Sequence, residues 1–211
     1  MNTVQLSNIA VLKGIIGGPF GSDLTSTDYV DSGIPVIRGS NMLPTGKIGG
    51  GFVYISNAKF ESSLNRNSAE AEDIIFTQRG TLGQVAQISQ NDSRKFVISQ
   101  SQMRLRVNKK IAVPRFVFYA CRTQDFLRAI DDLAIRTGVP HINLSILKEM
   151  MIPSPPLESQ RAIAEVLSAL DEKIAANSRT MLISQQLIMS MYQSLPTEGG
   201  AHLQDITVVR K

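Results

Sequence analysis

The stretch that decides the fold is LESQRAIAEVLSALDEKIAANSRTMLISQQLIMSMYQSL, residues 157–195. Alternating steps of four and three residues through it meet ten positions, of which eight are apolar. These positions are Ile163, Leu167, Leu170, Ile174, Asn177, Met181, Ser184, Ile188, Met191 and Leu195. A period of 3.5 residues is typical of the contact line of a coiled coil, whereas a helix on a globular core has a broader apolar face. The stretch predicts one long coiled-coil helix that needs a partner helix.

The sequence also marks where this helix begins and ends. Pro155 and Pro156 precede it and Glu158 falls in its first turn, where proline and negative charge are favoured. Pro196 follows its last turn. At about 1.5 Å per residue the helix would be roughly 55–60 Å long. We therefore expect it to project from the globular body that precedes it.

Two features of the helix leave alternatives open. The helix could fold back on its own body instead of pairing with a second chain. Asn177 and Ser184 lie within the apolar contact line. They either fix the register and number of the paired helices or face water where the helices separate.

Length and cysteine content limit the class of protein. The 211 residues suffice for one globular domain and an appendage. The single cysteine, Cys121, excludes an intrachain disulfide and a cysteine-based zinc site, and it fits a reducing compartment. The first residues do not form a signal peptide, and no apolar run is long enough to span a bilayer. We expect a soluble, cytoplasmic protein without contact to a membrane.

The charge is unevenly distributed. Residues 94–128 contain nine Lys or Arg residues and one acid, whereas the residues from Pro153 onward contain five basic and six acidic residues. A basic body with a near-neutral helix suggests that the body binds a polyanion and the helix binds protein. The alternative is a set of scattered, solvated charges.

Residues 1–152 predict an α+β body with a mixed β-sheet. Short apolar runs between turn residues predict strands at Ile34–Arg38, Phe52–Ile55, Asp73–Thr77, Gln84–Ile88, Phe96–Ile98 and Gln102–Val107. Val4–Lys13 predicts a strand or a helical turn, Arg115–Ile130 a helix, and Asn143 the N-cap of a short helix. The proline-rich segment Ile152–Pro156 predicts a hinge before the long helix.

The strand at Gln102–Val107 alternates in polarity. Met103, Leu105 and Val107 would face inward, which places Arg104 and Arg106 together on a polar outer face.

The end of the chain resembles its beginning. Leu203–Arg210 matches Leu6–Lys13 at six kinds of position, in the order Leu, Asn or Asp, Ile, Val, aliphatic and basic. The match is short, and chance similarity is the alternative. We divide the chain into a body (1–152), a coiled-coil dimerisation helix (153–198) and the start of a second repeat or a tail (199–211).

The sequence offers little for catalysis. The glycine-rich segment Gly17–Asp23 lacks the spacing of a nucleotide-binding loop and predicts a structural turn. His141 and His202 are the only histidines, and no pattern predicts a metal site or a nucleophile. A DNA methyltransferase would need an Asn/Asp-Pro-Pro-aromatic segment, which Ser154–Leu157 does not provide. We expect no catalysis by this chain and no cofactor of its own.

Several segments, taken in order, resemble the specificity subunits of type I restriction–modification systems. They are Gly18–Leu24 (GPFGSDL), Gly33–Arg38 (GIPVIR) with Asn41, Asp73–Gly83 (DIIFTQRGTLG), Thr137–Asn143 (TGVPHIN), Ile152–Gln160 (IPSPPLESQ) with Ile163-Ala164, and Leu170–Ile174 (LDEKI). Each is weakly specific alone, and their order and spacing together are specific. The family usually has Gly-Asp where this chain has Glu72-Asp73.

The resemblance implies both an architecture and a function. Members carry two target recognition domains and two long helices that pair antiparallel, so this chain corresponds to a half subunit whose homodimer restores the two-domain form. Each domain would recognise one half of a split target in double-stranded DNA, and the helices would set the gap between the halves. The helices also bind the methyltransferase subunits, which carry S-adenosylmethionine, and the complete enzyme adds ATP-driven restriction subunits. Twofold symmetry predicts an interrupted palindrome.

Base recognition requires forked donors and amides, and phosphate contacts require cations. The candidates for bases at predicted strand ends and loops are Arg38, Asn41, Arg79, Gln100, Gln102 and Arg136, with Ser40, Thr81 and His141 beside them. The candidates for phosphates are Lys47, Arg94, Lys95, Lys109 and Lys110. For each arginine the alternative is an ion pair within the domain. The candidates for the partner helix are Ile163, Leu167, Leu170, Ile174, Asn177, Met181, Ile188 and Met191.

Three other functions remain open from sequence alone. A coiled-coil adaptor whose basic body binds an acidic protein would bind DNA weakly and without sequence preference. A sequence-nonspecific nucleic-acid-binding protein would show a steep salt dependence without preferring any site. An unrecognised methyltransferase would bind S-adenosylmethionine by itself.

Overall fold

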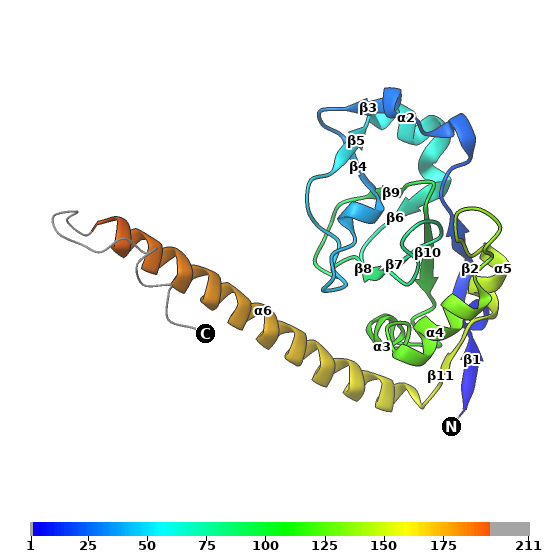
Figure 1. Cartoon of the computed structure of the whole chain (residues 1–211). Coiled ribbons are helices and arrows are strands. Elements are labelled where there is room, and N and C mark those ends of the chain that lie inside the picture. The colour runs from blue at the N-terminus through cyan, green and yellow to red at the C-terminus, as the bar shows by residue number, and fades with distance from the viewer. Residues whose placement is uncertain (1, 195–211) are drawn as a thin grey trace. The chain divides into compact units, whose positions relative to one another are not determined.

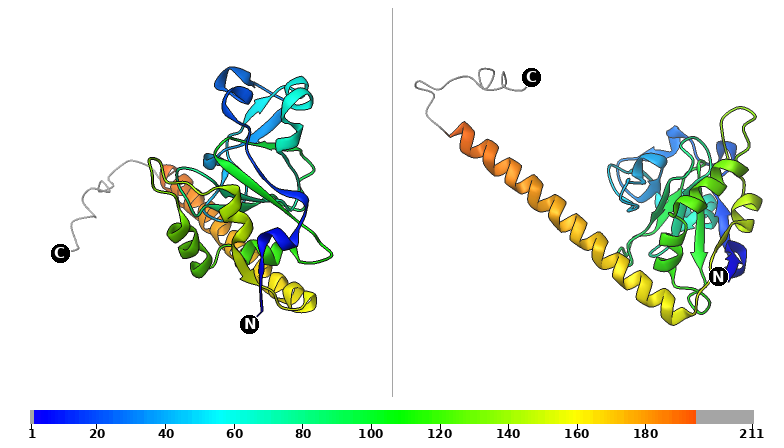
Figure 2. Two further views of the ribbon diagram at one scale, coloured as in Figure 1. Left: turned by 90° about the vertical axis from the view of Figure 1, so that its right-hand side faces the viewer. Right: turned by 60° about the horizontal axis from the view of Figure 1, so that its bottom comes forward.

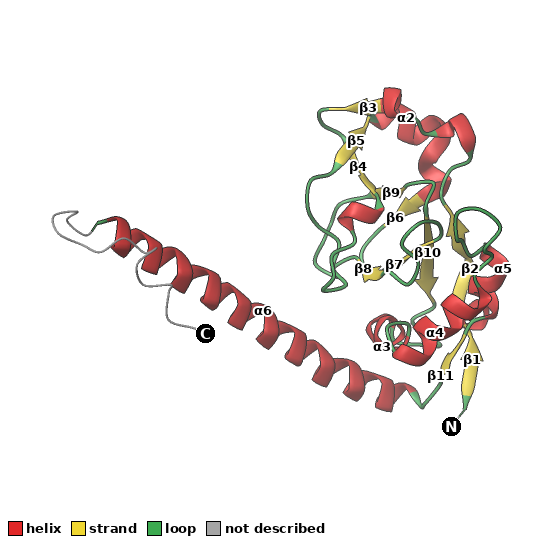
Figure 3. Ribbon diagram, viewed as in Figure 1, coloured by secondary structure: helices red, strands yellow, loops and turns green. Residues whose placement is uncertain are grey.

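The computed structural model describes residues 2–194, which fall into two units that meet between Glu165 and Val166. The first unit is α+β, as predicted, and contains three sheets (Figures 1 and 3). The proposed second repeat, 199–211, lies outside the described residues, as do Leu195 and Pro196. No helix among residues 2–194 is long and apolar enough to cross a membrane.

The two larger sheets carry most of the strands. A four-stranded antiparallel sheet has the order β2 (Ala10–Gly17), β10 (Gln102–Val107), β7 (Ile74–Thr77) and β8 (Val85–Gln87). A five-stranded sheet has the order β3 (Tyr29–Val30), β5 (Val53–Ile55), β4 (Ile34–Ile37), β9 (Phe96–Ile98) and β6 (Ser68–Ala69). In it β4 and β9 are parallel and the other pairs are antiparallel. The predicted strands are confirmed to within two residues, whereas the two-residue strands β3 and β6 carry no pattern that predicts them.

Helices pack on the four-stranded sheet. They are α1 (Leu6–Ile9), α3 (Pro114–Ala120), α4 (Gln124–Leu133) and α5 (Leu144–Glu149), while α2 (Asn57–Lys59) lies by the five-stranded sheet. Side chains of α3, α4 and α5 join the core cluster that also contains Met103 and Leu105 of β10, so these helices cover one face of the sheet. Asn143 accepts a hydrogen bond from the backbone N–H of Ile146 at 2.9 Å, which confirms it as the N-cap of α5.

Alternating side chains divide the core into layers. Met103, Leu105 and Val107 of β10 face the cluster shared with the helices, as predicted. Ile75 and Ala86 on the opposite face of the same sheet pack with apolar side chains of the five-stranded sheet. The two sheets therefore pack face to face, and β10 is covered on both sides.

Two predicted elements are corrected. The segment Arg115–Ile130 is two helices, because Thr123 interrupts it: the hydroxyl of Thr123 donates to the carbonyl of Ala120 at 2.9 Å and accepts from the N–H of Phe126 at 3.4 Å. The predicted hinge contains strand β11 (Met151–Pro153), which pairs with β1 (Thr3–Gln5) near the start of the chain.

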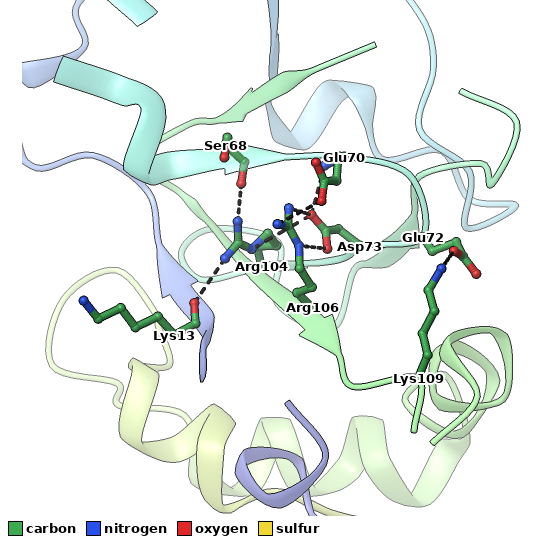
Figure 4. Close-up of polar contacts among 8 residues, drawn as sticks. All are labelled: Lys13, Ser68, Glu70, Glu72, Asp73, Arg104, Arg106 and Lys109. Carbon is green, nitrogen blue, oxygen red and sulfur yellow. Dashed lines mark hydrogen bonds and ion pairs between the residues drawn. The ribbon is translucent and has the colours of Figure 1, made fainter. Parts of the chain in front are cut away.

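The polar face of β10 is also corrected, because Arg104 is buried between the two sheets (Figure 4). Its guanidinium donates to the carbonyl of Ser68 in β6 and to that of Lys13 in β2. Asp73 accepts from the Nε and Nη2 atoms of Arg106 at 2.8 and 2.7 Å, and Glu70 lies 2.9 Å from Nη1 of Arg106. Burial lowers the pKa of Arg104, whereas the hydrogen bonds to Asp73 raise the pKa of Arg106.

The long helix α6 spans Leu157–Gln193, as predicted to within two residues, and Figure 2 shows it without interruption. Its first turns belong to the first unit, where Ala164 joins the core. Gln160 is buried there and accepts a hydrogen bond from the N–H of Val113 at 2.9 Å. From Val166 to Gln193 no side chain is buried, so the predicted contact line is open to solvent.

Replacing Asp73 by Ala should lower the free energy of unfolding by about 3–5 kcal/mol, because two arginines of β10 would lose their buried counter-charge. Chemical denaturation measures the change. Asp131→Ala is the matched control, since it removes a carboxylate from an exposed ion pair with Arg136 and should cost less than about 1 kcal/mol. Equal losses in the two variants would contradict the structural role of Asp73.

Candidate nucleic-acid interface

Five loops meet at one edge of the first unit. Gly17 at the end of β2 pairs with Met103, and Thr77 at the end of β7 pairs with Gln102, so both strands end where β10 begins. The loops, which we call the loop edge, are residues 18–24, 38–42, 78–84, 99–102 and 135–143.

Backbone hydrogen bonds join these loops to one another. The N–H of Gly18 donates to the carbonyl of Gln102 at 2.9 Å, and the N–H of Ser99 donates to that of Ile37 at 2.9 Å. The N–H of Ile142 donates to the carbonyl of Gln78 at 3.0 Å. The loop edge is therefore one connected surface built from segments far apart in the sequence.

Most of the predicted DNA-binding residues lie on the loop edge. They are Arg38, Ser40, Asn41, Arg79, Thr81, Gln100, Gln102, Arg136 and His141. Three predicted phosphate contacts lie elsewhere. Arg94 and Lys95 precede β9, and the backbone of Lys47 forms a β-bridge with Gln87 at the far end of β8. Lys109 and Lys110 follow the far end of β10. The structure thus brings together the predicted base contacts and separates them from the predicted phosphate contacts.

Three of the polar side chains form hydrogen bonds within the loop edge. The side chain of Asn41 is fully buried, where it accepts from the N–H of Arg38 at 3.0 Å and donates to the carbonyls of Gly49 and Gly51. Gln102 is also fully buried and its Oε1 atom accepts from the hydroxyl of Ser99. Gln100 donates to backbone carbonyls of the 18–24 loop. Asn41 and Gln102 are buried, so their predicted base contacts are revised to a role in positioning the loops. Gln100 is exposed, and its contact with a base stays a prediction beside its role in holding the 18–24 loop.

Arg79 is an exposed cation of the loop edge. Within residues 2–194 its side chain forms no hydrogen bond or ion pair, while a backbone β-bridge joins it to His141. Ser40 and Thr81 are also exposed. Arg136 differs from Arg79 because it donates to the carboxylate of Asp131 at 2.7 Å. An arginine with free donors is suited to the forked contacts that recognise guanine.

A groove of about 530 Å³ opens beside Ser40. Its walls include Gly39, Gln84 and Arg122, and no acidic residue lines it. Arg122 donates to the carbonyls of Pro44 and Thr45 at 2.9 Å each, which holds the wall formed by the segment after Asn41. Arg122 lies inside a segment that predicts one continuous helix, so no local pattern indicates this role.

Two observations concern metal and thiol chemistry in the described residues. Residues 2–194 contain no cluster of three or more His, Cys, Asp or Glu side chains that could hold a metal ion. Cys121 is fully buried, and burial raises the pKa of its thiol, which keeps it protonated and weakly nucleophilic.

Comparison with known proteins decides the family. Residues 21–182 match the model of the type I restriction modification DNA specificity domain, which covers most of the chain. The chain belongs to this family. The match includes four of the five loops of the loop edge in full and most of α6.

Curated relatives of this specificity domain are longer than the chain. The specificity subunit of the type I restriction enzyme MjaVIII from Methanocaldococcus jannaschii is 29% identical over 107 residues, which are 50% of this chain and 24% of the relative. That of HindI from Haemophilus influenzae is 24% identical over 145 residues, 66% of this chain and 31% of the relative. The chain therefore spans about a quarter to a third of the curated relatives.

Solved structures share the fold. The HsdS subunit from Thermoanaerobacter tengcongensis superposes with a TM-score of 0.61 at 21% identity, over 95% of this chain and 51% of that one. A second solved chain comes from a structural study of complex assembly and conformational transition of the type I R-M system. It superposes with a TM-score of 0.64 at 18% identity, over 92% of this chain and 44% of that one. The specificity domain thus corresponds in fold to about half of each solved chain.

Replacing Arg79 by Ala should weaken binding to the preferred duplex by about 1–3 kcal/mol, because a forked base contact is lost. Fluorescence anisotropy with labelled duplexes measures the affinity. Lys110 is a predicted phosphate contact that the structure places at the opposite end of β10, so Lys110→Ala should change the affinity less than twofold if DNA binds at the loop edge. A larger loss in the Lys110 variant would place DNA at that end instead.

Proposed function

We propose that this chain is the non-catalytic DNA-recognition part of a type I restriction–modification enzyme in the cytoplasm. The observation that carries the proposal is the family match, which runs through the loop edge and into the long helix. The chain would bind double-stranded DNA by the loop edge. S-adenosylmethionine and ATP would be bound by the methyltransferase and restriction subunits and not by this chain.

We further propose that two copies pair through α6. On the predicted contact line, Leu170, Ile174, Met181, Ile188 and Met191 are each 54–64% exposed, and Leu167 is half-buried. Apolar side chains at a spacing of 3.5 residues are buried effectively by a second helix of the same kind. The chain matches about half of each solved relative, so a homodimer would restore the number of domains and helices that one such relative contains.

Docking of the methyltransferase subunit is supported by a second apolar surface on α6. Met181, Leu182 and Ile183 are consecutive and are each 55–62% exposed. Consecutive residues of an α-helix point about 100° apart, so they face three directions. In a two-stranded coiled coil the second helix would bury Met181, whereas Leu182 and Ile183 would stay exposed and could contact another protein. Leu187 and Met189, each 59% exposed, extend these faces.

A twofold axis between identical recognition domains determines the form of the target. Each copy would present the same loop edge to one half-site, with the paired helices fixing the distance between them. The preferred DNA would then be an interrupted palindrome. An adaptor protein would bind DNA without preference, and a nonspecific binder would select no motif.

Replacing both Leu170 and Ile174 by Lys should convert the dimer into a monomer, because two charges would enter the apolar contact line. Sedimentation velocity measures the oligomeric state of each variant. The matched control is Ala176→Lys, two residues beyond Ile174 and thus about 200° around the helix, which should remain dimeric. A double variant that stays dimeric would exclude pairing through this line.

The complete proposal is tested by adding a type I methyltransferase subunit to the wild-type chain. We expect a larger complex in sedimentation and transfer of methyl groups to duplex DNA, whereas neither protein alone should methylate it. The proposed role would be contradicted if the chain did not bind the methyltransferase subunit, or if the chain by itself bound S-adenosylmethionine.

A further inference from the structure

The glycine-rich segment Gly17–Asp23 exposes an aromatic side chain, which a simple turn does not require. It follows β2 and lies on the loop edge, and Phe20 near its middle is 81% exposed. An exposed phenylalanine does not contribute the stability that burial of its ring would give. Folding alone therefore does not explain an exposed phenylalanine at position 20.

The backbone of this loop is tightly constrained on both sides of Phe20. A Cβ atom on Gly18 would lie 1.9 Å from the carbonyl oxygen of Ser99, so only glycine fits there. Pro19 is buried and its ring fixes one backbone dihedral. Gly21 has a φ of +46°, in the left-handed region, although the space around it is open. The sequence GGPFG thus encodes one particular path of the backbone.

Side chains from other segments hold this path in place. The amide of Gln100 donates to the carbonyls of Gly21 and Leu24 at 2.6 and 2.9 Å. Asn67 donates to the carbonyl of Gly17 at 2.8 Å. Asp23 accepts from Arg66 at 2.6 Å, which also neutralises the one acidic charge of the loop. Phe20 is therefore presented by a loop that loses little conformational entropy when it binds.

The surroundings favour DNA over protein as the occupant. A stable protein interface needs roughly 800 Å² from each partner, whereas a single aromatic side chain contributes about 150–250 Å². Within residues 18–24 the other exposed residues are Gly21 and Ser22, so the loop carries no continuous apolar patch. A lone apolar side chain with a polar surround is the form in which proteins insert between base steps of a duplex. The loop edge also carries the accessible Arg79.

We propose that Phe20 is a DNA-contacting residue whose ring packs against the bases at one step of the bound duplex, with Gln100 as its positioning residue. This proposal rests on the proposed function, since it requires that the loop edge faces DNA. Phe20 adds an apolar contact that tolerates different bases, while residues such as Arg79 distinguish them.

The chain contains no tryptophan, so a single one is a specific probe. Phe20→Trp keeps an aromatic ring at the tip of the loop. Leu12→Trp is the matched control, because Leu12 is 93% exposed and lies in the first half of β2, away from the loop edge. Both variants are labelled with 5-fluorotryptophan, whose fluorine resonance is visible even when the chain is bound to an unlabelled methyltransferase subunit.

The probe is the duplex that the wild-type complex with methyltransferase selects from a random-sequence library. On its addition the fluorine resonance of Phe20→Trp should shift, and that of Leu12→Trp should not. Phe20→Ala should weaken binding about tenfold without changing the preferred sequence, as expected for the loss of one stacking contact. Gln100→Ala should weaken binding less than Phe20→Ala, because it loosens the loop and retains the ring.

Three results would overturn the proposal. If the wild-type complex binds its duplex while the Phe20→Trp resonance stays unchanged and Phe20→Ala binds equally well, Phe20 does not contact DNA and the proposed function stands. If the resonance shifts when the methyltransferase is added and DNA causes no further change, Phe20 contacts protein. If the wild-type complex selects no sequence at all, the proposed function fails together with this inference.

Discussion

The carboxylate of Asp73 is the group on which the arrangement of the two large sheets depends. It is almost fully buried and receives both hydrogen bonds of Arg106, while Arg104 on the same strand reaches β6 in one sheet and β2 in the other (Figure 4). Buried cations are tolerated only where counter-charge and hydrogen-bond acceptors meet them. This network therefore ties β10 to both sheets.

The position of β10 in turn places the loop edge. Its first residue, Gln102, is buried among the ends of β2 and β7. Just before it, the backbone of Ser99 bonds to Ile37 at the start of one loop, and the side chain of Gln100 holds another. The polar residues of the loop edge divide into an inner set that fixes backbone and an outer set that is exposed. The outer set, which includes Arg79, is available to a ligand, as is the exposed ring of Phe20. Rigid support of this kind lowers the entropy that binding would otherwise cost.

The long helix has the opposite character, because its apolar side chains are exposed around much of its circumference from Val166 onward. Such a surface is unfavourable in water and is expected where protein partners cover it. Under the proposed function the two parts of the chain therefore bind different kinds of partner: the loop edge would bind DNA and α6 would bind other proteins.

Local patterns predicted most of the fold. The 3.5-residue period gave α6, two-residue alternation gave β10, and Asn143 marked the start of α5, because each depends on residues that are near in sequence. Strand β11 was missed, since a proline-rich segment pairs with β1 at the other end of the unit. The burial of Arg104 was also missed, because its partners come from Lys13 and Ser68.

The candidate site was predictable in composition and less so in geometry. Arg38, Ser40 and Arg79 were predicted as DNA contacts because each lies at a strand end or in a loop, and the structure places all three on one edge. Their contact with DNA stays a prediction. The sequence could not separate exposed from buried amides, so Asn41 and Gln102 were grouped with the outer residues although both are fully buried. Phe20 was missed because an apolar residue in a glycine-rich turn is ordinarily assigned to the core, and the backbone beside it is held by Gln100, which is far away in sequence.

The most direct test of the account is to sequence the DNA that the assembled complex of this chain and a methyltransferase subunit recovers from random duplexes. The account predicts one motif made of two inverted, identical half-sites separated by a gap of constant length. Recovery of unselected sequences, or of one undivided asymmetric motif, would contradict recognition by two identical copies of this chain.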